Sequence, residues 1–114
     1  MKIHYLEIVT PDPEASVALY SEIHAVSFNP PDELLGGART ATLSNGEMLG
    51  IRAPMRDTET PVVRPYYLVE DIEEAIAIAA ESGAEIAMMP TDIPGRGRFA
   101  LFIQGGIETG LWQV

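Results

Sequence analysis

The stretch Thr10-Pro11-Asp12-Pro13-Glu14-Ala15 has a counterpart at Val69-Glu70-Asp71-Ile72-Glu73-Glu74. The two aspartates lie 59 residues apart, and each precedes residues that favour the start of a helix. An aspartate at the N-cap accepts backbone N–H bonds, proline suits the first helical position, and acidic residues in the first turn complement the helix dipole. We therefore predict that a helix begins at each site, and the repetition indicates a duplicated unit.

Apolar residues follow each cap at helical spacing, which predicts that each helix packs one face on a sheet. The predicted buried stripes are Val17, Leu19, Tyr20 and Ile23 in the first helix, and Ile72, Ile76, Ala79 and Ala80 in the second. Ser82-Gly83 is typical of a helix end, because glycine adopts positive φ readily. The equivalent residue in the first copy is His24, a residue type enriched at positive φ.

Strand-like segments surround both helices. One precedes each helix, at 4–9 and 64–69, and another follows each, at 26–28 and 85–88. A loop rich in Pro and Gly, at 29–37 and at 89–97, then leads to a hairpin: 39–43 with 48–53 turning at Asn45-Gly46, and 99–103 with 108–114 turning at Gly105-Gly106. We predict an α+β fold in one domain, 1–114, with two tandem βαβββ modules, 1–53 and 62–114, joined by a linker at 54–61.

Composition limits the partners of the chain. The 114 residues are 46% hydrophobic, contain no cysteine and carry a net charge of −10. This charge repels phosphate backbones and anionic lipid surfaces, so neither nucleic acid nor membrane is an expected partner. No apolar run approaches the roughly 18 residues of a membrane span, and the N-terminus lacks a signal-peptide profile, so we expect a soluble, cytoplasmic protein.

The order and spacing of these elements resemble the vicinal oxygen chelate superfamily, which includes glyoxalase I, bleomycin-resistance proteins and extradiol dioxygenases. In the first copy the resemblance rests on Tyr5-Leu6-Glu7-Ile8-Val9-Thr10-Pro11-Asp12 with Leu19-Tyr20. In the second it rests on Leu68-Val69-Glu70-Asp71-Ile72-Glu73, Ser82-Gly83-Ala84, Gly97-Arg98-Phe99-Ala100-Leu101-Phe102 and Gly110-Leu111-Trp112-Gln113. The resemblance implies curved mixed sheets around a cleft, and a homodimer.

Metal-dependent members of this superfamily place a His or Glu ligand on the first and last strands of each copy. The corresponding positions here are Tyr5, Gly50, Pro65 and Gly110, none of which binds a divalent metal in the usual way. His4 is an unsuitable substitute, because strand alternation places it with Leu6 and Ile8 on the face turned toward the helices. We therefore expect a metal-less member with no cofactor.

Strand alternation also predicts which side chains line the cleft. They are an aromatic wall with a few charges, the composition expected of a small-molecule pocket, and comprise Tyr5, Glu7, Met48, Arg52, Tyr67, Glu108 and Trp112. Trp112 and Tyr67 could stack on a planar ligand, and Arg52 could pair with a carboxylate.

Three functions remain open. The leading hypothesis is that the cleft binds a small, partly aromatic molecule, as drug-sequestering members of the superfamily do. The second is a metal-independent isomerase or lyase, in which Glu7 is the general base and Arg52 or Tyr5 stabilises negative charge on oxygen. The third is a structural or regulatory dimer in which these residues are core, and Glu7 and Arg52 form only a structural ion pair.

Overall fold

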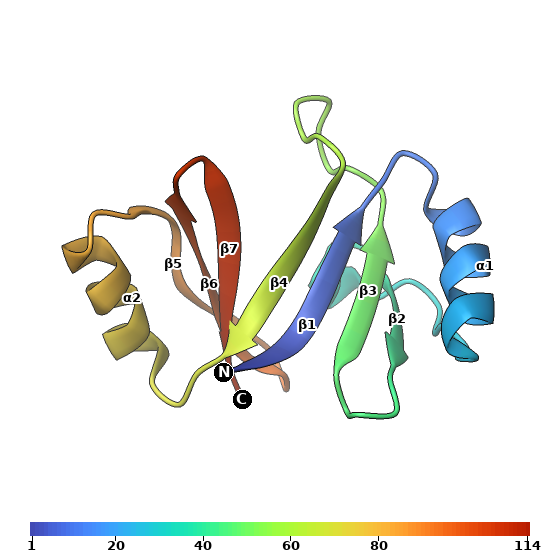
Figure 1. Cartoon of the computed structure of the whole chain (residues 1–114), viewed down its shortest axis with the longest axis horizontal. Helices are drawn as coiled ribbons and strands as arrows, with labels where there is room; N and C mark the ends of the chain where they lie inside the picture. Colours follow the sequence, from blue (N-terminus) through green and yellow to red (C-terminus); the bar gives the residue numbers. More distant parts are fainter. The chain divides into compact units, whose positions relative to one another are not determined.

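The computed structural model describes all residues, Met1–Val114, and has seven strands and two α-helices (Figure 1). In chain order the elements are β1 (Lys2–Val9), α1 (Pro13–His24), the short 3-10 helix η1 (Glu33–Leu35), β2 (Arg39–Thr42), β3 (Met48–Arg52), β4 (Val62–Leu68), α2 (Ile72–Glu81), β5 (Glu85–Ile93), β6 (Gly97–Gln104) and β7 (Ile107–Gln113). They form two compact units. The first unit is Tyr5–Val63, and the second is Arg64–Val114 together with Met1–His4. The predicted α+β class is confirmed.

In the first unit, β3 is the middle strand. It runs parallel to β1 and antiparallel to β2, with Glu7 opposite Gly50 and Val9 opposite Arg52. Asp12 caps α1 as predicted, accepting a hydrogen bond from the Ala15 amide. The helix buries Val17 against apolar residues of β1 and β3, namely Ile8, Leu49 and Ile51.

The strand predicted at 26–28 does not form. The Asn29 amide donates to the Thr40 carbonyl at 2.7 Å, but the two residues that follow, Pro30 and Pro31, have no N–H to continue a ladder. The side chain of Arg39 instead donates to the carbonyls of Asn29 and Phe28. The first copy is therefore βαββ, with an irregular segment where a strand was predicted.

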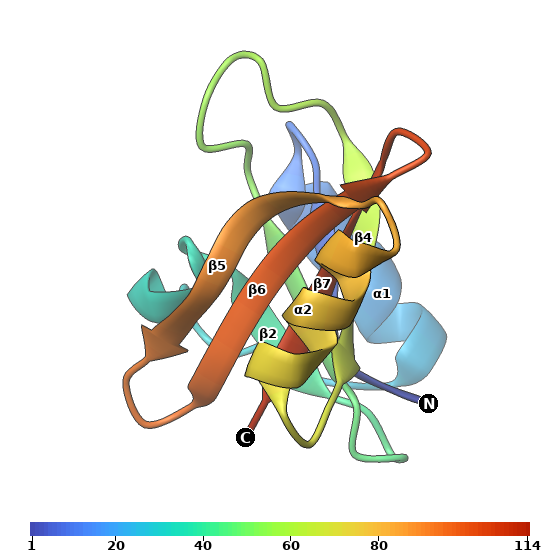
Figure 2. The same cartoon turned by 90° about the vertical axis from the view of Figure 1, so that its left-hand side faces the viewer.

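The second unit contains all the predicted elements. Its strands lie in the order β4-β7-β6-β5, with β4 parallel to β7 and the other neighbours antiparallel. Asp71 caps α2, which lies across one face of this sheet (Figure 2) and buries Ile72 and Ile76 against Ala100 and Leu111. Strand β5 is longer than predicted, and the register shifts between Met88 and Thr91. The shift surrounds Pro90, which an edge strand tolerates because its missing N–H need not pair.

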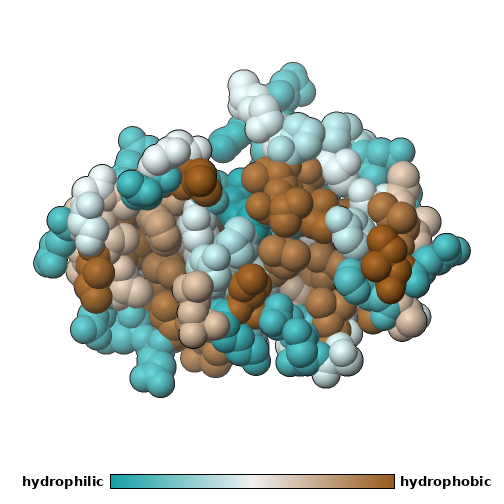
Figure 3. All heavy atoms as spheres, viewed as in Figure 1, coloured by the Kyte–Doolittle hydropathy of each residue, from teal (hydrophilic) through white to brown (hydrophobic).

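The first helix differs from the prediction in its stripe and at its end. Leu19 and Ile23 are 56% and 61% exposed, so they are not buried on the sheet, and Figure 3 shows apolar groups among hydrophilic ones over α1. The helix includes His24, and Ala25 is the residue with positive φ, at 52°.

Neither helix has the length and apolar content needed to cross a bilayer.

The two helix ends provide a matched pair of substitutions. Ala25 has a left-handed conformation that costs a residue with a Cβ about 1 kcal/mol, whereas the second copy has Gly83 at φ 96° after its helix. We expect Ala25→Gly to raise the free energy of unfolding by up to about 1 kcal/mol and Gly83→Ala to lower it by a similar amount. Urea unfolding followed by Trp112 fluorescence measures both. If both substitutions raised the free energy of unfolding, or both lowered it, this account of the helix ends would be contradicted.

Candidate functional site

A buried arginine connects three segments of the first unit. Arg52, the last residue of β3, donates from Nε to Glu7 Oε2 on β1 at 2.8 Å. Its Nη1 and Nη2 donate to the two carboxylate oxygens of Glu59 at 2.9 and 2.7 Å, and Nη1 also donates to the Ala53 carbonyl. Glu59 in turn accepts from the Met55 amide at 2.7 Å. The predicted linker at 54–61 is thus held against the end of β3.

The charges of this cluster are almost fully removed from solvent. The side chains of Arg52, Glu7 and Glu59 are 4%, 7% and 13% exposed. Burial by itself lowers the pKa of Arg52, but the hydrogen bonds and attraction from Glu59 and Glu7 outweigh it, so the pKa is raised above its ordinary value. Arg52 therefore stays charged, with its guanidinium directed at protein carboxylates.

Each copy places a tyrosine ring over a glycine. A methyl group built on Gly50 would overlap the Tyr5 ring, and one built on Gly110 would overlap the Tyr66 ring. Neither glycine has positive φ, so the requirement for glycine is one of space. Tyr5 and Tyr66 are 2% and 7% exposed, and the rings occupy the room that larger side chains would need.

The second-unit positions differ from those predicted. Tyr66 lies opposite Gly110 as Glu7 lies opposite Gly50, so the residue equivalent to Tyr5 is Arg64, and Pro65 was assigned one residue out of register. Tyr67 was predicted to share the face of Trp112, and this is wrong: Tyr67 packs against the cluster of Ile72 and Ile76 beneath α2. Tyr66 takes the predicted place, with its ring 6.0 Å from Trp112 at 79°.

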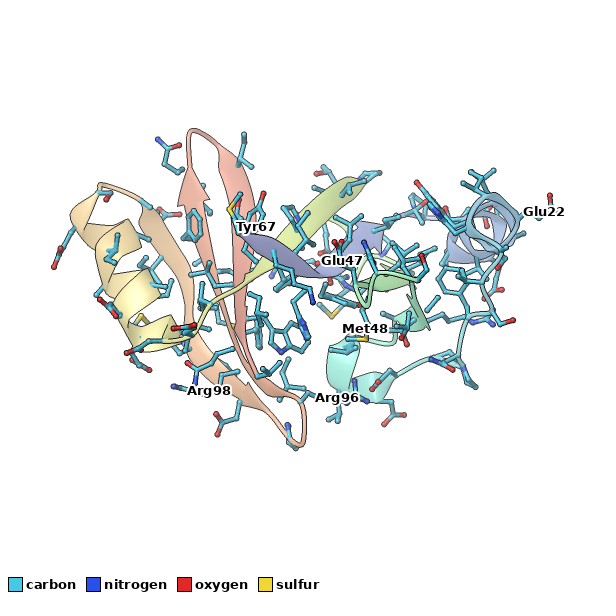
Figure 4. All side chains as sticks on the ribbon, turned by 60° about the horizontal axis from the view of Figure 1, so that its bottom comes forward. Glu22, Glu47, Met48, Tyr67, Arg96 and Arg98 are labelled. Carbon is cyan, nitrogen blue, oxygen red and sulfur yellow. The ribbon has the colours of Figure 1, made fainter.

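The remaining predicted residues are brought together within their own units. Met48 lies opposite Tyr5 in the pairing of β3 with β1, and Figure 4 labels it together with Tyr67. Glu108 forms an ion pair at 3.1 Å with the buried Arg64. Trp112 is 1% exposed, and its Nε1 donates to the Arg96 carbonyl at 3.0 Å. Most of these side chains therefore already bond to or pack against other residues of the protein.

His4 contacts Trp112, with ring centroids 5.0 Å apart. His4 was predicted to lie with Leu6 and Ile8 beneath a helix, but it packs instead against the Trp112 ring. Burial and, to a smaller extent, the positive charge of Lys2 lower the pKa of His4 below 6.5. The folded protein therefore disfavours the charged imidazole.

This depressed pKa predicts a pH effect. The unfolded chain binds the His4 proton more readily than the folded chain, so the stability from neutral His4 is complete above pH 6.5 and is lost as pH falls through the lower folded pKa. Trp112 emission should fall over the same range, because an imidazolium quenches a neighbouring indole. Fluorescence titration of wild type and His4→Gln measures this. His24→Gln, which removes the histidine beside Tyr20, is the control, and an unchanged profile in His4→Gln would contradict the assignment.

A pocket of about 320 Å³ lies in the first unit at the carboxyl end of β3. Its walls come from the first turn of α1, from the segment around Gly36 and Gly37, and from residues 51–55. The stem of Arg52 forms part of the wall, close to Gly36, and prolines with Met55 supply much of the rest. Arg39 contributes a second guanidinium. The pocket thus combines apolar surface with a few polar groups, as small-molecule sites do.

Sequence reasoning missed several residues of these clusters: Arg39, Glu59, Arg64, Tyr66 and Phe99. The helix caps carried a usable signal, since their spacing of 59 residues relates Glu7 to Tyr66 and Tyr5 to Arg64. No comparable signal indicated Glu59, which lies in a segment of ordinary linker composition.

Comparison with protein-family models and with curated proteins finds no match. Solved structures do match over nearly the whole chain. The hypothetical protein BH1468 from Bacillus halodurans C-125 is 14% identical, with a TM-score of 0.76 over 99% of this chain and 94% of that one. Methylmalonyl-CoA epimerase from Mycobacterium tuberculosis is 14% identical, with a TM-score of 0.73 over 97% and 86%. A variant of the Streptomyces coelicolor epimerase, in complex with 2-nitronate-propionyl-CoA, is 16% identical, with a TM-score of 0.70 over 99% and 96%.

This chain therefore shares its fold with BH1468 and with the methylmalonyl-CoA epimerases. At the sheet positions that the sequence comparison of the two copies predicted for metal ligands, the first copy has Tyr5 and Gly50. In the register observed between β4 and β7, the corresponding residues of the second copy are Arg64 and Gly110, with Tyr66 opposite Gly110. No three His, Asp or Glu side chains lie close enough together to hold a metal ion.

Proposed function

We propose that this chain is a metal-less protein of the vicinal oxygen chelate fold that binds a small, partly aromatic molecule. The metal-less part of the proposal rests on the pair of glycines beneath tyrosine rings, Gly50 under Tyr5 and Gly110 under Tyr66, and the binding part rests on the pocket beside Arg52. A glycine offers no side-chain ligand, and the space for one is filled by a ring. Arg64 occupies the position of the second copy that corresponds to Tyr5. Its permanent positive charge would repel a metal cation. The residues present therefore do not fit a divalent metal.

The pocket beside Arg52 is the proposed binding site. It lies within one unit, is bounded by rigid prolines and by Met55, and has a volume within the usual range for small ligands. The arginine behind its wall is held by Glu7 and Glu59, so the wall is fixed before a ligand arrives. A preformed site loses less conformational entropy on binding.

The same contacts favour a binding protein over an isomerase or lyase. Glu7 would have to leave Arg52 to accept a substrate proton, and Arg52 would have to leave two carboxylates to stabilise an oxyanion. The likeness to an epimerase keeps the enzymatic alternative worth testing. Glu7→Gln separates the two: a binder keeps most of its affinity, whereas an enzyme that uses Glu7 as its base loses turnover. Dimerisation stays a prediction.

A thermal-shift screen over aromatic, cationic, carboxylate and 2-oxo compounds tests the proposal. A ligand at one hundred times its Kd adds about 2.7 kcal/mol, which corresponds to a rise in Tm of roughly 10 °C for a chain of this size. Ala53→Phe should fill the pocket and remove the rise. Ala80→Phe should retain it, because Ala80, which was predicted to be buried, lies on the exposed surface of α2. A hit that survives Ala53→Phe would contradict the proposed site.

A further inference from the structure

The fixed charge that faces the pocket is Arg39, at the start of β2. Its Nε donates to the Asn29 carbonyl at 3.1 Å and its Nη2 to the Phe28 carbonyl at 3.5 Å, so backbone oxygens orient the guanidinium. Arg52 also borders the pocket, but Glu7 and Glu59 neutralise it. Arg39 is therefore the cation available to a ligand.

An exposed carboxylate occupies the remaining side of Arg39. Glu14, in the first turn of α1, accepts from Nη1 at 3.0 Å, and both residues line the pocket. The side chain of Glu14 is 71% exposed, whereas that of Arg39 is 27% exposed. An exposed ion pair contributes little to stability, so displacing Glu14 should reduce affinity by no more than about fivefold.

We infer that the pocket recognises a small carboxylic acid with an apolar body, whose carboxylate replaces Glu14 on Arg39. An arginine edge held in place by backbone carbonyls suits a planar carboxylate, because charge-assisted hydrogen bonds to a guanidinium are strong and directional. The apolar body would lie on Pro13, Pro31, Pro54 and Met55. This inference rests on the proposed function, since it names the ligand class of the same pocket.

The overall charge of the protein does not favour anions. Its net charge of −10 opposes their approach, although at physiological salt this field is screened beyond about 8 Å. Selection for a carboxylate must therefore arise locally, at Arg39. Removing any acidic residue changes the net charge equally, but only Glu14 competes for this arginine.

The test compares phenylacetate with its uncharged counterpart phenylacetamide by NMR titration of the full chain. Wild type should bind phenylacetate several-fold more tightly, because a charge-assisted hydrogen bond to Arg39 outweighs the loss of the exposed Glu14 pair. Glu14→Ala should tighten phenylacetate binding up to about fivefold and leave the amide unchanged. Glu22→Ala, which makes the same change in net charge from the exposed surface of α1, should alter neither.

Arg39→Gln should remove the preference for the acid. Arg39→Lys, which retains the charge but loses the planar edge, should keep only part of it. Equal binding of acid and amide by wild type, with Ala53→Phe excluding both, would overturn the carboxylate inference and leave the proposed pocket standing. Binding of neither compound in millimolar titrations would overturn the inference, and the wider thermal-shift screen would then decide the proposed function separately.

Discussion

Arg52→Ala is expected to lower the free energy of unfolding by about 3–5 kcal/mol. The change removes a guanidinium that bonds both Glu7 and Glu59, whose carboxylates are 7% and 13% exposed. A loss of this size is a large fraction of the 5–15 kcal/mol typical of a folded domain. Urea unfolding followed by Trp112 fluorescence, with circular dichroism as a second probe, measures it.

Arg98→Ala is the matched control. Arg98 is also a strand arginine that pairs with two carboxylates, Glu73 and Asp92, but those side chains are 60% and 82% exposed. Figure 4 labels Arg98 together with Arg96 of the preceding turn. The control should cost less than about 1 kcal/mol. Similar losses for the two arginines would show that burial does not govern the Arg52 cluster.

A second substitution, Glu59→Gln, tests the same cluster if the Arg52→Ala protein fails to fold. It leaves Arg52 bonded to Glu7, so a smaller loss is expected than for Arg52→Ala. The weakened hold on residues 54–61 should appear as faster proteolysis there. Unchanged proteolysis would argue that this segment does not depend on Glu59.

Gly50→Ala and Gly110→Ala are expected to lower the free energy of unfolding by about 2–3 kcal/mol or more each. The added methyl group meets the ring of Tyr5 or of Tyr66, and both rings are buried among neighbours that leave little room to move. Denaturant unfolding again provides the measurement.

A double-mutant cycle isolates the cause. If the ring is the obstacle, the cost of Gly50→Ala should be smaller by at least about 1 kcal/mol in a Tyr5→Ala background, because smaller side chains leave space for the methyl group. The same holds for Gly110→Ala with Tyr66→Ala. Additive costs would show that backbone conformation, and not the ring, requires glycine at these sites.

Much of the fold was predictable because local signals agree with the tertiary structure. Asp12 and Asp71 cap their helices through side-chain oxygens, and Gly105 and Gly106 adopt the positive φ that a two-residue hairpin turn requires. The strand at 26–28 failed because tertiary contacts override a short apolar run: Arg39 takes the carbonyls of Phe28 and Asn29, and two prolines follow.

The candidate site was less predictable, because it depends on single-residue register. The helix caps are 59 residues apart and the hairpin glycines Gly50 and Gly110 are 60 apart, so the offset changes between the start and the end of each copy. Applying 60 to the first strand selected Pro65, whereas 59 relates Glu7 to Tyr66, in agreement with the pairing to Gly50 and Gly110. Adjacent tyrosines at 66 and 67 concealed the error, because an aromatic ring faces each side of β4.

The central claim is that this chain uses the fold for metal-free binding, and calorimetric titration with a compound selected by the thermal-shift screen tests it most directly. The titration is run on protein treated with EDTA and on protein supplemented with one equivalent of a divalent metal. We predict the same Kd within twofold and one binding site per chain in both. Loss of binding in EDTA, restored by a stoichiometric metal ion, would contradict the claim.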